Sequence, residues 1–517
     1  MQLIDFFLKG VERYPDRAVV VDGDRRWTYA EMAKLVDQVA SALIHAGLRP
    51  GAKVAIYSPN HALVLAAQYG ALRAGCLWVP VSHRNSASST HDALAALGVD
   101  WLFVHSSLAE AATAARAAVP SLKGVIGIDR DIGALPGLIE WSQRTPFADN
   151  FPLLGSNSPA AILMSSGTTG KPKGIVLSQL AFTSMIASFD ALLPVGEAPI
   201  HLVVAPLTHA AGIYAMALLA HGGTNWLQHA AEPGAILKAL ADSRATTVFL
   251  PPTIIYMMLA HPDVRKHDYS SLRSLLYGAA PMSVQKLREA MALFGPVLAQ
   301  GYGQSEALMC CTFLSAQDHA EALANPQLER RLRSAGREGP MVRVAIMDEA
   351  GKLLGAGEQG EIVVRGDIVM DHYHDNPEAT AEAQLFGWHH TGDIGFKDAD
   401  GFIYIVDRKK DMIISGGFNV FPAEVEQVLM AHQTVKDCAV VGVPDDKWGE
   451  AVLAVVELLP GAEFDEAALI AYTKQHLGSV KAPKKIQVME ALPRSAVGKV
   501  VRREIRDPFW RGRDRKV

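Results

Sequence analysis

Two spacings of apolar residues alternate along the first two thirds of the chain. Residues 30–46 and 63–74 carry apolar side chains at helical spacing, whereas KVAIYSP (53–59) and CLWVPV (76–81) are short apolar runs typical of buried strands. Similar short runs recur as DWLFVH, GVIGID, AAILMSS, HLVVAPL, TTVFLPP and SLLYGAA. Strands that alternate with helices predict an α/β fold with largely parallel sheets and flanking helices.

The pattern changes after Met341. The runs RVAIMDE, GEIVVRG and GFIYIVDR are separated by the turn sequences EAGK and DADG, which predicts a small antiparallel β region. From Asp411 onward, AEVEQVLMAH and residues 466–477 are typical of helices, and DCAVVGVP and AVLAVVEL of strands. We therefore predict two domains, a large N-terminal domain over residues 1–410 and a small α+β domain over residues 411–517.

Composition narrows the class of protein. The 517 residues are 49% hydrophobic and 20% charged, which is typical of a folded chain and argues against disorder. A net charge of −5 gives no general attraction to nucleic acid. The four cysteines form no CxxC pair, so we expect neither disulfides nor zinc. Without a signal peptide or an apolar run long enough to span a bilayer, we expect a cytoplasmic protein with no integral membrane association; a homodimer stays open.

A polar loop between two apolar runs is the strongest chemical signal. Its three glycines allow backbone N–H groups to turn toward a phosphate, its hydroxyls add donors, and its lysines add positive charge. It is not a Walker A loop, because Gly-Lys is followed by Pro. The alternative is a flexible polar loop. The residues are Ser165, Ser166, Gly167, Thr168, Thr169, Gly170, Lys171, Pro172, Lys173 and Gly174.

A second motif, GYGQSE, follows the apolar run PVLA. Glu306 is a reasonable Mg²⁺ ligand beside a phosphate loop, because Mg²⁺ prefers one or two carboxylates together with phosphate oxygens. Tyr302, between two glycines, could stack on a base. A Ser-Glu pair that caps a helix would have the same sequence, and that alternative stays open.

Two further motifs carry charges toward the C-terminus. In TGD, the carboxylate of Asp393 is suited to the two hydroxyls of a ribose, and in DRKKD the guanidinium of Arg408 is suited to a phosphate. An ordinary turn and a solvated run of charges are the alternatives. Lys499 lies in a glycine-containing loop near the end of the chain, where a surface lysine is the usual explanation.

Together and in this order, SSGTTGKPKG, YGxSE, TGD, DRKKDMIISGGFNV and the terminal GK resemble the acyl-adenylate-forming superfamily of acyl-CoA synthetases, adenylation domains and luciferases. The resemblance runs from TYAEM near the N-terminus to the Lys499 loop, and it is to the acyl-CoA synthetase branch. It implies that a small-molecule carboxylic acid, ATP and coenzyme A are converted into an acyl-CoA, AMP and pyrophosphate through an acyl-adenylate, with Mg²⁺. It also implies that the C-terminal domain is mobile.

The resemblance assigns roles in ATP binding and adenylation. Glu306 would bind Mg²⁺, and Lys499 would bridge the acid's carboxylate and the α-phosphate. Lys410 would be the hinge between the domains. The other ATP contacts would be Ser165, Ser166, Gly167, Thr168, Thr169, Gly170 and Lys173 at the β- and γ-phosphates, Tyr302 at adenine, Ser305 at the α-phosphate, and Asp393 with Arg408 at the ribose.

It likewise assigns the acyl and coenzyme A sites. His209 would lie at the mouth of the acyl pocket, although a packed histidine at a helix start is an equal alternative. The pocket would be apolar, which favours a fatty acyl or aryl acid. Its other residues would be Ala211, Ala279, Gly301, Leu308 and Met309, and the coenzyme A contacts would be Ser415, Gly416, Gly417 and Trp448.

Three alternatives remain. An amino-acid adenylation domain that serves a carrier protein would place an Asp soon after His209, but THAAGIYAMALLAHGG contains no acidic residue. A luciferase-like oxidase gains no support from the residues. A nucleotide-binding sensor without catalysis is disfavoured, because Glu306, Asp393, Arg408 and Lys499 are all present.

Overall fold

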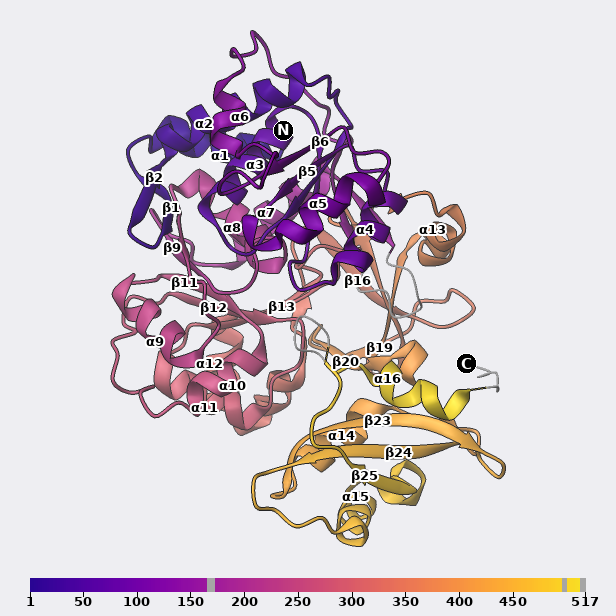
Figure 1. Ribbon diagram of the computed structural model, residues 1–517. Coiled ribbons are helices and arrows are strands. Elements are labelled where there is room, and N and C mark those ends of the chain that lie inside the picture. Colours follow the sequence, from indigo (N-terminus) through magenta and orange to yellow (C-terminus); the bar gives the residue numbers. More distant parts are fainter. Residues whose placement is uncertain (165–172, 495–499, 512–517) are drawn as a thin grey trace. The chain divides into compact units, whose positions relative to one another are not determined.

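The computed structural model describes residues 1–164, 173–494 and 500–511. The chain divides into two compact units (Figure 1), each with its own hydrophobic core. The first unit comprises Met1–Val344 and Val364–His389, and the second comprises Ala345–Val363 and His390–Val517. This division is based on which residues contact one another. The predicted boundary at residue 410 concerns which parts of the chain move as domains, and it stays a prediction.

One of the two sheets of the first unit is mostly parallel, as the alternation predicted. Within the described chain it has nine strands, of which those from β13 to β1 run parallel and β15, β14 and β2 are antiparallel at the edges. In spatial order they are β15 (Arg337–Glu338), β14 (Thr312–Leu314), β13 (Leu298–Tyr302), β12 (Ser274–Gly278), β11 (Thr247–Leu250), β9 (Ile200–Val203), β10 (Thr224–Leu227), β1 (Ala18–Asp22) and β2 (Arg25–Thr28).

The other sheet of the first unit contains the strands on either side of the predicted phosphate loop. It has seven strands among the described residues, and those from β7 to β6 run parallel. In spatial order they are β18 (His372–Tyr373), β8 (Gly174–Ser178), β7 (Pro159–Met164), β4 (Leu77–Val81), β3 (Lys53–Tyr57), β5 (Trp101–Val104) and β6 (Gly124–Gly127). The strand pairs β7–β8 and β8–β18 are antiparallel.

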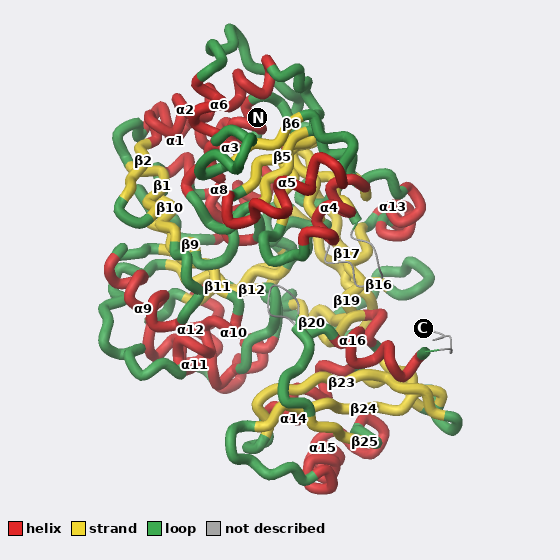
Figure 2. Tube along the Cα trace, viewed as in Figure 1, coloured by secondary structure: helices red, strands yellow, loops and turns green. Residues whose placement is uncertain are grey.

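Helices lie against these sheets (Figure 2), and their apolar side chains pack in the cores. One core cluster joins β11, β12 and β13 to Ile236, Met258 and Leu287 of three helices. The helices of this unit are α1 (Ile4–Arg13), α2 (Tyr29–His45), α3 (Ala62–Arg73), α4 (Ala87–Ala96), α5 (Ala109–Ala118), α6 (Leu138–Gln143), α7 (Gln179–Leu192), α8 (Ala210–Ala217), α9 (Pro233–Asp242), α10 (Pro252–Leu259), α11 (Val284–Phe294), α12 (Ala316–Ala324) and α13 (Pro377–Ala383).

Local capping explains where the predicted helices begin. Thr28 accepts a hydrogen bond from the N–H of Glu31, whose carboxylate accepts one from the N–H of Thr28, so this capping box fixes the start of α2. Both α2 and α3 begin and end one residue earlier than the pattern predicted. The β1–β2 hairpin escaped prediction, because β2 is too short and exposed to show an alternating pattern.

The second unit contains an antiparallel sheet and an α+β region, in agreement with the pattern of the sequence. A sheet of four described strands has the order β16 (Val342–Met347), β17 (Gln359–Gly366), β19 (His389–Lys397) and β20 (Ile403–Arg408). A second sheet contains β22 (Phe418–Val420), β21 (Ile413–Ser415), β24 (Gly449–Leu458) and β23 (Val435–Asp445), with β25 (Lys485–Val488) beside β24. The helices α14 (Pro422–Met430), α15 (Glu466–Lys481) and α16 (Arg502–Arg506) accompany it.

Among the described residues, no helix has both the length and the apolar character that crossing a bilayer requires.

His201 on β9 is a polar side chain inside the core of the first unit. Its exposure is 0%, and its ring meets Tyr214 edge-on with centroids 5.1 Å apart. Nδ1 lies 3.4 Å from the carbonyl oxygen of Thr247, and no described residue hydrogen-bonds to Nε2. Burial lowers the pKa of His201 to about 4, so the imidazole is neutral at pH 7.

This burial predicts a pH dependence of stability. Because the folded-state pKa lies below the unfolded value of about 6.5, stability is full above that pH and falls as the pH drops toward 4, by about 3 kcal/mol for His201. We expect His201→Phe, which keeps an aromatic ring, to reduce the fall in unfolding free energy between about pH 7.5 and about pH 4.5, measured by urea denaturation. His45→Phe, at an exposed position, is the control; equal pH dependence in both variants would contradict the assignment.

Candidate active site

The predicted phosphate loop connects two antiparallel neighbours, β7 and β8. Met164 pairs with Gly174, so the two ends of the loop are adjacent. The predicted ligands Ser165, Ser166, Gly167, Thr168, Thr169 and Gly170 lie outside the described residues. Lys173 is described, and its Nζ lies 4.7 Å from the ring centroid of Tyr373. A cationic side chain is therefore held at the C-terminal end of the loop.

Ser305 and Glu306 lie in a tight turn, not at a helix start. The N–H of Gln304 donates to the carbonyl of Ala307 at 2.8 Å, which closes the turn. The N–H of Met370 donates to the carbonyl oxygen of Glu306 at 2.7 Å and fixes the turn to a distant segment. The helix-capping alternative for this Ser-Glu pair is therefore excluded, and Glu306 is free of that local role.

Tyr373 is a site residue that the sequence motifs did not reveal. It lies on β18, where it pairs with Ile175 of β8, and its hydroxyl donates to Oε1 of Glu306 at 3.0 Å. Burial, with the charge of Glu306 adding to it, raises the pKa of Tyr373, so the hydroxyl keeps its proton. Tyr373 thus joins Lys173 to Glu306. Their positions in the sequence are too far apart for any local pattern to indicate the contact.

The carboxyl ends of β12 and β13 bring together Ala279, Gly301 and Met309 of the predicted acyl pocket. Gly278 pairs with Gly301, and Ala279 follows with a φ of 68°. A Cβ added at Gly301 would lie 3.2 Å from the carbonyl oxygen of Met309, a close contact that would require Met309 to shift. Leu308 is buried at 1% exposure. Tyr302, the predicted adenine contact, ends β13 beside these residues.

A buried polar network supports these strand ends from behind. The hydroxyl of Tyr277 lies 2.8 Å from Nε2 of His319 on α12 and 3.1 Å from Oε1 of Gln300 on β13. Nδ1 of His319 lies 2.7 Å from the carbonyl oxygen of Ser315, and burial lowers the pKa of His319 to about 4. The neutral ring therefore donates through Nδ1, which leaves Nε2 as a hydrogen-bond acceptor facing the Tyr277 hydroxyl, whose one hydrogen also has Oε1 of Gln300 within reach.

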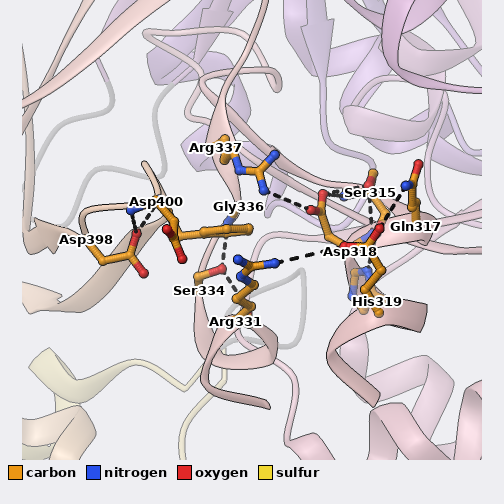
Figure 3. A network of polar contacts seen from close by, with 12 residues as sticks. Ser315, Gln317, Asp318, His319, Arg331, Ser334, Gly336, Arg337, Asp398 and Asp400 are labelled. Carbon is orange, nitrogen blue, oxygen red and sulfur yellow. Dashed lines mark hydrogen bonds and ion pairs between the residues drawn. The ribbon is translucent and has the colours of Figure 1, made fainter. Parts of the chain in front are cut away.

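Figure 3 shows how the start of α12 is held beside this network. The N–H of Asp318 donates to the hydroxyl of Ser315 at 3.0 Å, and the N–H of Ser315 donates to Oδ2 of Asp318 at 3.2 Å, which forms a capping box. Arg337 points toward Asp318 at 3.4 Å. Because His319 follows directly, these contacts fix its ring under Tyr277. The fully buried Tyr277 side chain is consequently part of the scaffold.

His209 occupies the position before α8 but does not cap the helix. Nδ1 lies 3.0 Å from the hydroxyl of Thr208. Burial lowers the pKa of His209 to about 4, with the neighbouring charges of His83 and Arg84 adding to the effect. Ala211, which follows, is fully buried. His209 is therefore a neutral hydrogen-bonding group at the start of α8; its role at an acyl pocket stays a prediction.

In the second unit, Asp393 and Arg408 form an ion pair on neighbouring strands. They are register partners on β19 and β20, and Nε of Arg408 lies 2.7 Å from Oδ1 of Asp393. Thr391 donates to the carbonyl of Ile362 at 2.6 Å and accepts the N–H of Asp393 at 3.1 Å. The carboxylate is only 5% exposed, whereas Arg408 is 45% exposed. The TGD and DRKKD motifs therefore supply the two partners of an ion pair whose carboxylate is buried, and the backbone of Asp393 is fixed by Thr391.

The predicted coenzyme A residues form one hairpin in the same unit. Ser415 pairs with Phe418, so Gly416 and Gly417 are the two central residues of the turn, with φ values of 60° and 81°. Positive φ at both positions is what a type I′ hairpin needs. The N–H of Gly416 donates to the carbonyl of Trp448 at 2.8 Å, and a Cβ at Gly416 would lie 2.6 Å from the indole ring. Trp448 itself is 41% exposed.

The predicted residues thus fall into two groups. The first unit joins Lys173 to Glu306 through Tyr373 and gathers Gly301 with its neighbours, and the second unit pairs Asp393 with Arg408 and builds the glycine hairpin. Lys410 is exposed in the short helical turn Lys409–Asp411. Lys499 lies outside the described residues.

Comparisons with known proteins identify the family. The family model described as AMP-binding enzyme matches residues 7–374, and the one described as AMP-binding enzyme C-terminal domain matches residues 424–499. The chain belongs to the AMP-binding enzyme family. The predicted membership in the acyl-adenylate-forming superfamily, in its acyl-CoA synthetase branch, is thereby confirmed.

Three relatives span almost the whole of this AMP-binding enzyme. The medium/long-chain-fatty-acid–CoA ligase FadD8 of Mycobacterium tuberculosis is 36% identical over 525 residues, covering 98% of the chain and 90% of the relative. A feruloyl-CoA synthase of Amycolatopsis sp. is 36% identical over 497 residues, covering 96% of each. The structure of the amide bond synthetase McbA from Marinactinospora thermotolerans matches with a TM-score of 0.88 at 30% identity, covering 98% of this chain and 100% of McbA. The predicted fold class is confirmed.

The role of Glu306 as a Mg²⁺ ligand in this AMP-binding enzyme stays a prediction. Among the described residues, only Tyr373 hydrogen-bonds to its carboxylate, and it does so at Oε1. The described residues contain no group of three or more His, Cys, Asp or Glu that could hold a metal by themselves. A Mg²⁺ ion held mainly by phosphate oxygens and one carboxylate fits both observations.

Tyr373→Phe tests whether the hydroxyl orients Glu306. Loss of the donor is expected to raise the Mg²⁺ concentration for half-maximal ATP turnover about 10–100-fold, because partners that orient a metal-binding carboxylate contribute that much to affinity. The measurement is a Mg²⁺ titration at saturating nucleotide. Tyr404→Phe, which removes a hydroxyl 3.2 Å from Asp398, is the matched control. An unchanged Mg²⁺ requirement in Tyr373→Phe would exclude this role.

Proposed function

We propose that this AMP-binding enzyme is an ATP-dependent acid–CoA ligase. It joins a carboxylic acid to AMP with release of pyrophosphate and then transfers the acyl group to coenzyme A. The observation that carries the proposal is the likeness, at 36% identity and over at least 96% of the chain, to two enzymes named as CoA ligases. The hydrogen bond from Tyr373 to Glu306 and the Asp393–Arg408 ion pair also support it, since the proposed reaction uses Glu306 for Mg²⁺ and this pair for the ribose.

The first half-reaction brings two anions together. A carboxylate oxygen of the acid attacks the α-phosphorus of ATP, and the bond from that phosphorus to the bridging oxygen breaks, so pyrophosphate leaves. No general base is required, because the acid is already ionised at pH 7. The cations Lys173 and Lys499 reduce the repulsion and stabilise charge on the phosphates. Glu306 would hold Mg²⁺, which neutralises phosphate charge when bound.

The second half-reaction needs a thiol at the acyl carbonyl. The thiol sulfur forms a bond to the acyl carbon, the bond to the AMP oxygen breaks, and the thiol proton is released. Ser415, Gly416 and Gly417 form a tight turn that a pantetheine chain can approach closely, and the exposed Trp448 ring is suited to stack on an adenine. In this proposal, rotation about Lys410 exchanges the Lys499 loop for this hairpin.

We further infer that the acid is apolar, either a fatty acid or an aryl acid. Two observations support this: Leu308 and Ala211 are buried, and the segment 208–223, which contains His209 and ends before β10, has no acidic residue. His209 has a lowered pKa because of burial, so it provides a neutral group at that position. FadD8 and the feruloyl-CoA synthase represent the two acid classes by name.

The test measures both half-reactions with Mg-ATP over a panel of medium- and long-chain fatty acids and hydroxycinnamic acids. Acid-dependent pyrophosphate release reports adenylation, and acyl-CoA formation reports transfer. We expect Lys499→Ala to lower adenylation about 10²–10³-fold, as removal of one charge-stabilising group does. Lys484→Ala, at an exposed lysine of the same unit, is the control and should retain wild-type rates.

Other outcomes would redirect the assignment. Pyrophosphate release without acyl-CoA would replace coenzyme A by another acceptor, which the likeness to an amide bond synthetase makes a specific alternative, and an amine or a carrier protein would then be tested as acceptor. ATP binding without turnover on any acid would overturn the ligase proposal in favour of a nucleotide-binding sensor.

A further inference from the structure

Glu361 is a buried carboxylate on β17 that contacts the neighbours of the predicted ribose pair. Its Oε1 accepts the N–H of Gly392 at 3.0 Å, and its Oε2 lies 3.1 Å from Nδ1 of His390 and 3.2 Å from Nζ of Lys409. The Glu361 side chain is only 11% exposed. Both oxygens of the carboxylate are therefore engaged, one by the backbone of the TGD motif and the other by two basic side chains.

The charge of Glu361 is matched within the second unit. Burial by itself would raise the pKa of Glu361, but the hydrogen bond with His390 and the charge of Lys409 outweigh burial and hold that pKa below its usual range. The carboxylate is consequently ionised at pH 7. Because hydrogen bonds to an ionised acceptor are stronger than those to a neutral one, Glu361 holds the N–H of Gly392 more firmly than an amide oxygen would.

Gly392 is the point at which β19 departs from regular strand geometry. Its φ of 70° lies in the left-handed region, which glycine enters at little cost. The hydroxyl of Thr391 donates to the carbonyl of Ile362 and accepts the N–H of Asp393, and the N–H of Gly392 donates to Glu361. Two consecutive residues of β17, Glu361 and Ile362, therefore fix the backbone that leads into Asp393.

Glu361 also reaches the other partner of the ribose pair. Nε of Arg408 lies 2.7 Å from Asp393, and the next residue, Lys409, pairs with Glu361. Two consecutive residues of the DRKKD motif therefore bind two different carboxylates, and one of these carboxylates also binds the residue before Asp393. Glu361 thereby links the chain on the Asp393 side of the pair to the chain on the Arg408 side.

We propose that Glu361 is a positioning residue for ribose recognition, which acts through Asp393. This inference rests on the proposed function, in which Asp393 binds the ribose hydroxyls. Two hydroxyls can both bind one carboxylate only if its oxygens are held at matching distances and angles, and a displacement of about 1 Å is enough to lose such contacts. Loss of the Glu361 charge weakens the restraints on both sides of the Asp393–Arg408 pair.

The second unit offers a matched carboxylate away from the ribose pair. Glu457 accepts the N–H of Leu492 at 2.6 Å, lies 3.0 Å from Nζ of Lys436 and 3.3 Å from Arg494, and has a side chain that is 4% exposed. Its partners belong to β23 and to the chain after β25, not to TGD or DRKKD. Glu457 thus resembles Glu361 in burial, in its backbone contact and in its lysine partner.

The experiment compares Glu361→Gln with Glu457→Gln in the full chain and measures nucleotide binding by calorimetry, without acid or coenzyme A. The dissociation constants of Mg-ATP, Mg-2′-deoxyATP and Mg-3′-deoxyATP give the preference for each ribose hydroxyl. We expect the wild type and Glu457→Gln to bind ATP about tenfold or more tightly than either deoxynucleotide, as a hydrogen bond to a charged group provides. In Glu361→Gln we expect the preference to fall at least about threefold, because the new amide turns its NH₂ toward Lys409 or Gly392.

A double-mutant cycle separates positioning from general stabilisation. If Glu361 acts through Asp393, Glu361→Gln changes the preference in the wild type but not in Asp393→Asn, which lacks the carboxylate that binds the hydroxyls. Equal weakening of ATP and both deoxynucleotides in either background would make Glu361 a structural residue and overturn the inference. Lys409→Met, at a side chain that is 46% exposed, provides a second variant if Glu361→Gln does not fold. It should lower the preference in the same direction, and an unchanged preference would also overturn the inference.

Acyl-CoA formation in the same preparation tests the proposed function separately. If the wild type forms no acyl-CoA but prefers ATP to the deoxynucleotides, the ligase proposal fails, and the binding preference of the variants still decides the role of Glu361. If the wild type forms acyl-CoA but binds all three nucleotides equally, Asp393 does not bind the ribose hydroxyls, and the inference about Glu361 is overturned while the ligase proposal stands.

Discussion

A buried guanidinium needs its charge matched, and Arg502 meets this need by collecting three carboxylates from separate elements. Asp407 comes from the end of β20, Asp411 from the turn that follows it, and Glu426 from α14. Arg502 keeps two carboxylates when one is removed, whereas loss of Arg502 itself would take the guanidinium away from all three, which is costly for buried carboxylates. The strand β20 and the helices α14 and α16 therefore hold one another through a single side chain. Arg408, which pairs with Asp393 of the neighbouring strand β19, lies on β20 beside Asp407, so the geometry of that pair depends on this arrangement.

In the first unit, the main constraint is that polar side chains inside an apolar core need hydrogen-bond partners. Glu306 is held by a tyrosine hydroxyl and by the backbone of Met370, and the ends of β12 and β13 are supported by the contact of Tyr277 with His319. Burial keeps His201, His209 and His319 neutral, so these rings act as hydrogen-bonding groups and contribute no charge. The positive charge that a polyphosphate requires must then come from lysine and arginine. In this unit, Lys173 beside Tyr373 is such a residue.

The sequence predicts much of this fold because its local signals are strong. The 3.6-residue spacing locates α2 and α3, short apolar runs locate β3 and β4, and the two glycines at 416 and 417 agree with a tight turn. The site is less predictable. Glu306 and Asp393 are marked by motifs, but each motif has an ordinary structural explanation that only tertiary contacts remove. Tyr373 carries no local signal, and the DRKKD motif that contains Asp407 does not indicate its contact with Arg502, since the two partners lie 67 and 95 positions away along the chain.

The separation between Asp407 and Arg502 also limits how the enzyme can be recombined with its relatives. A chimera spliced at Lys410 would take Asp407 from one parent and Asp411, Glu426 and Arg502 from the other. The residues that contact one another through Arg502 would then come from two different proteins. A splice placed ahead of β19 transfers the ribose pair, all three carboxylates and Arg502 as one module. For exchanging acid specificity between such enzymes, the loop after α13 is therefore the sounder crossover point.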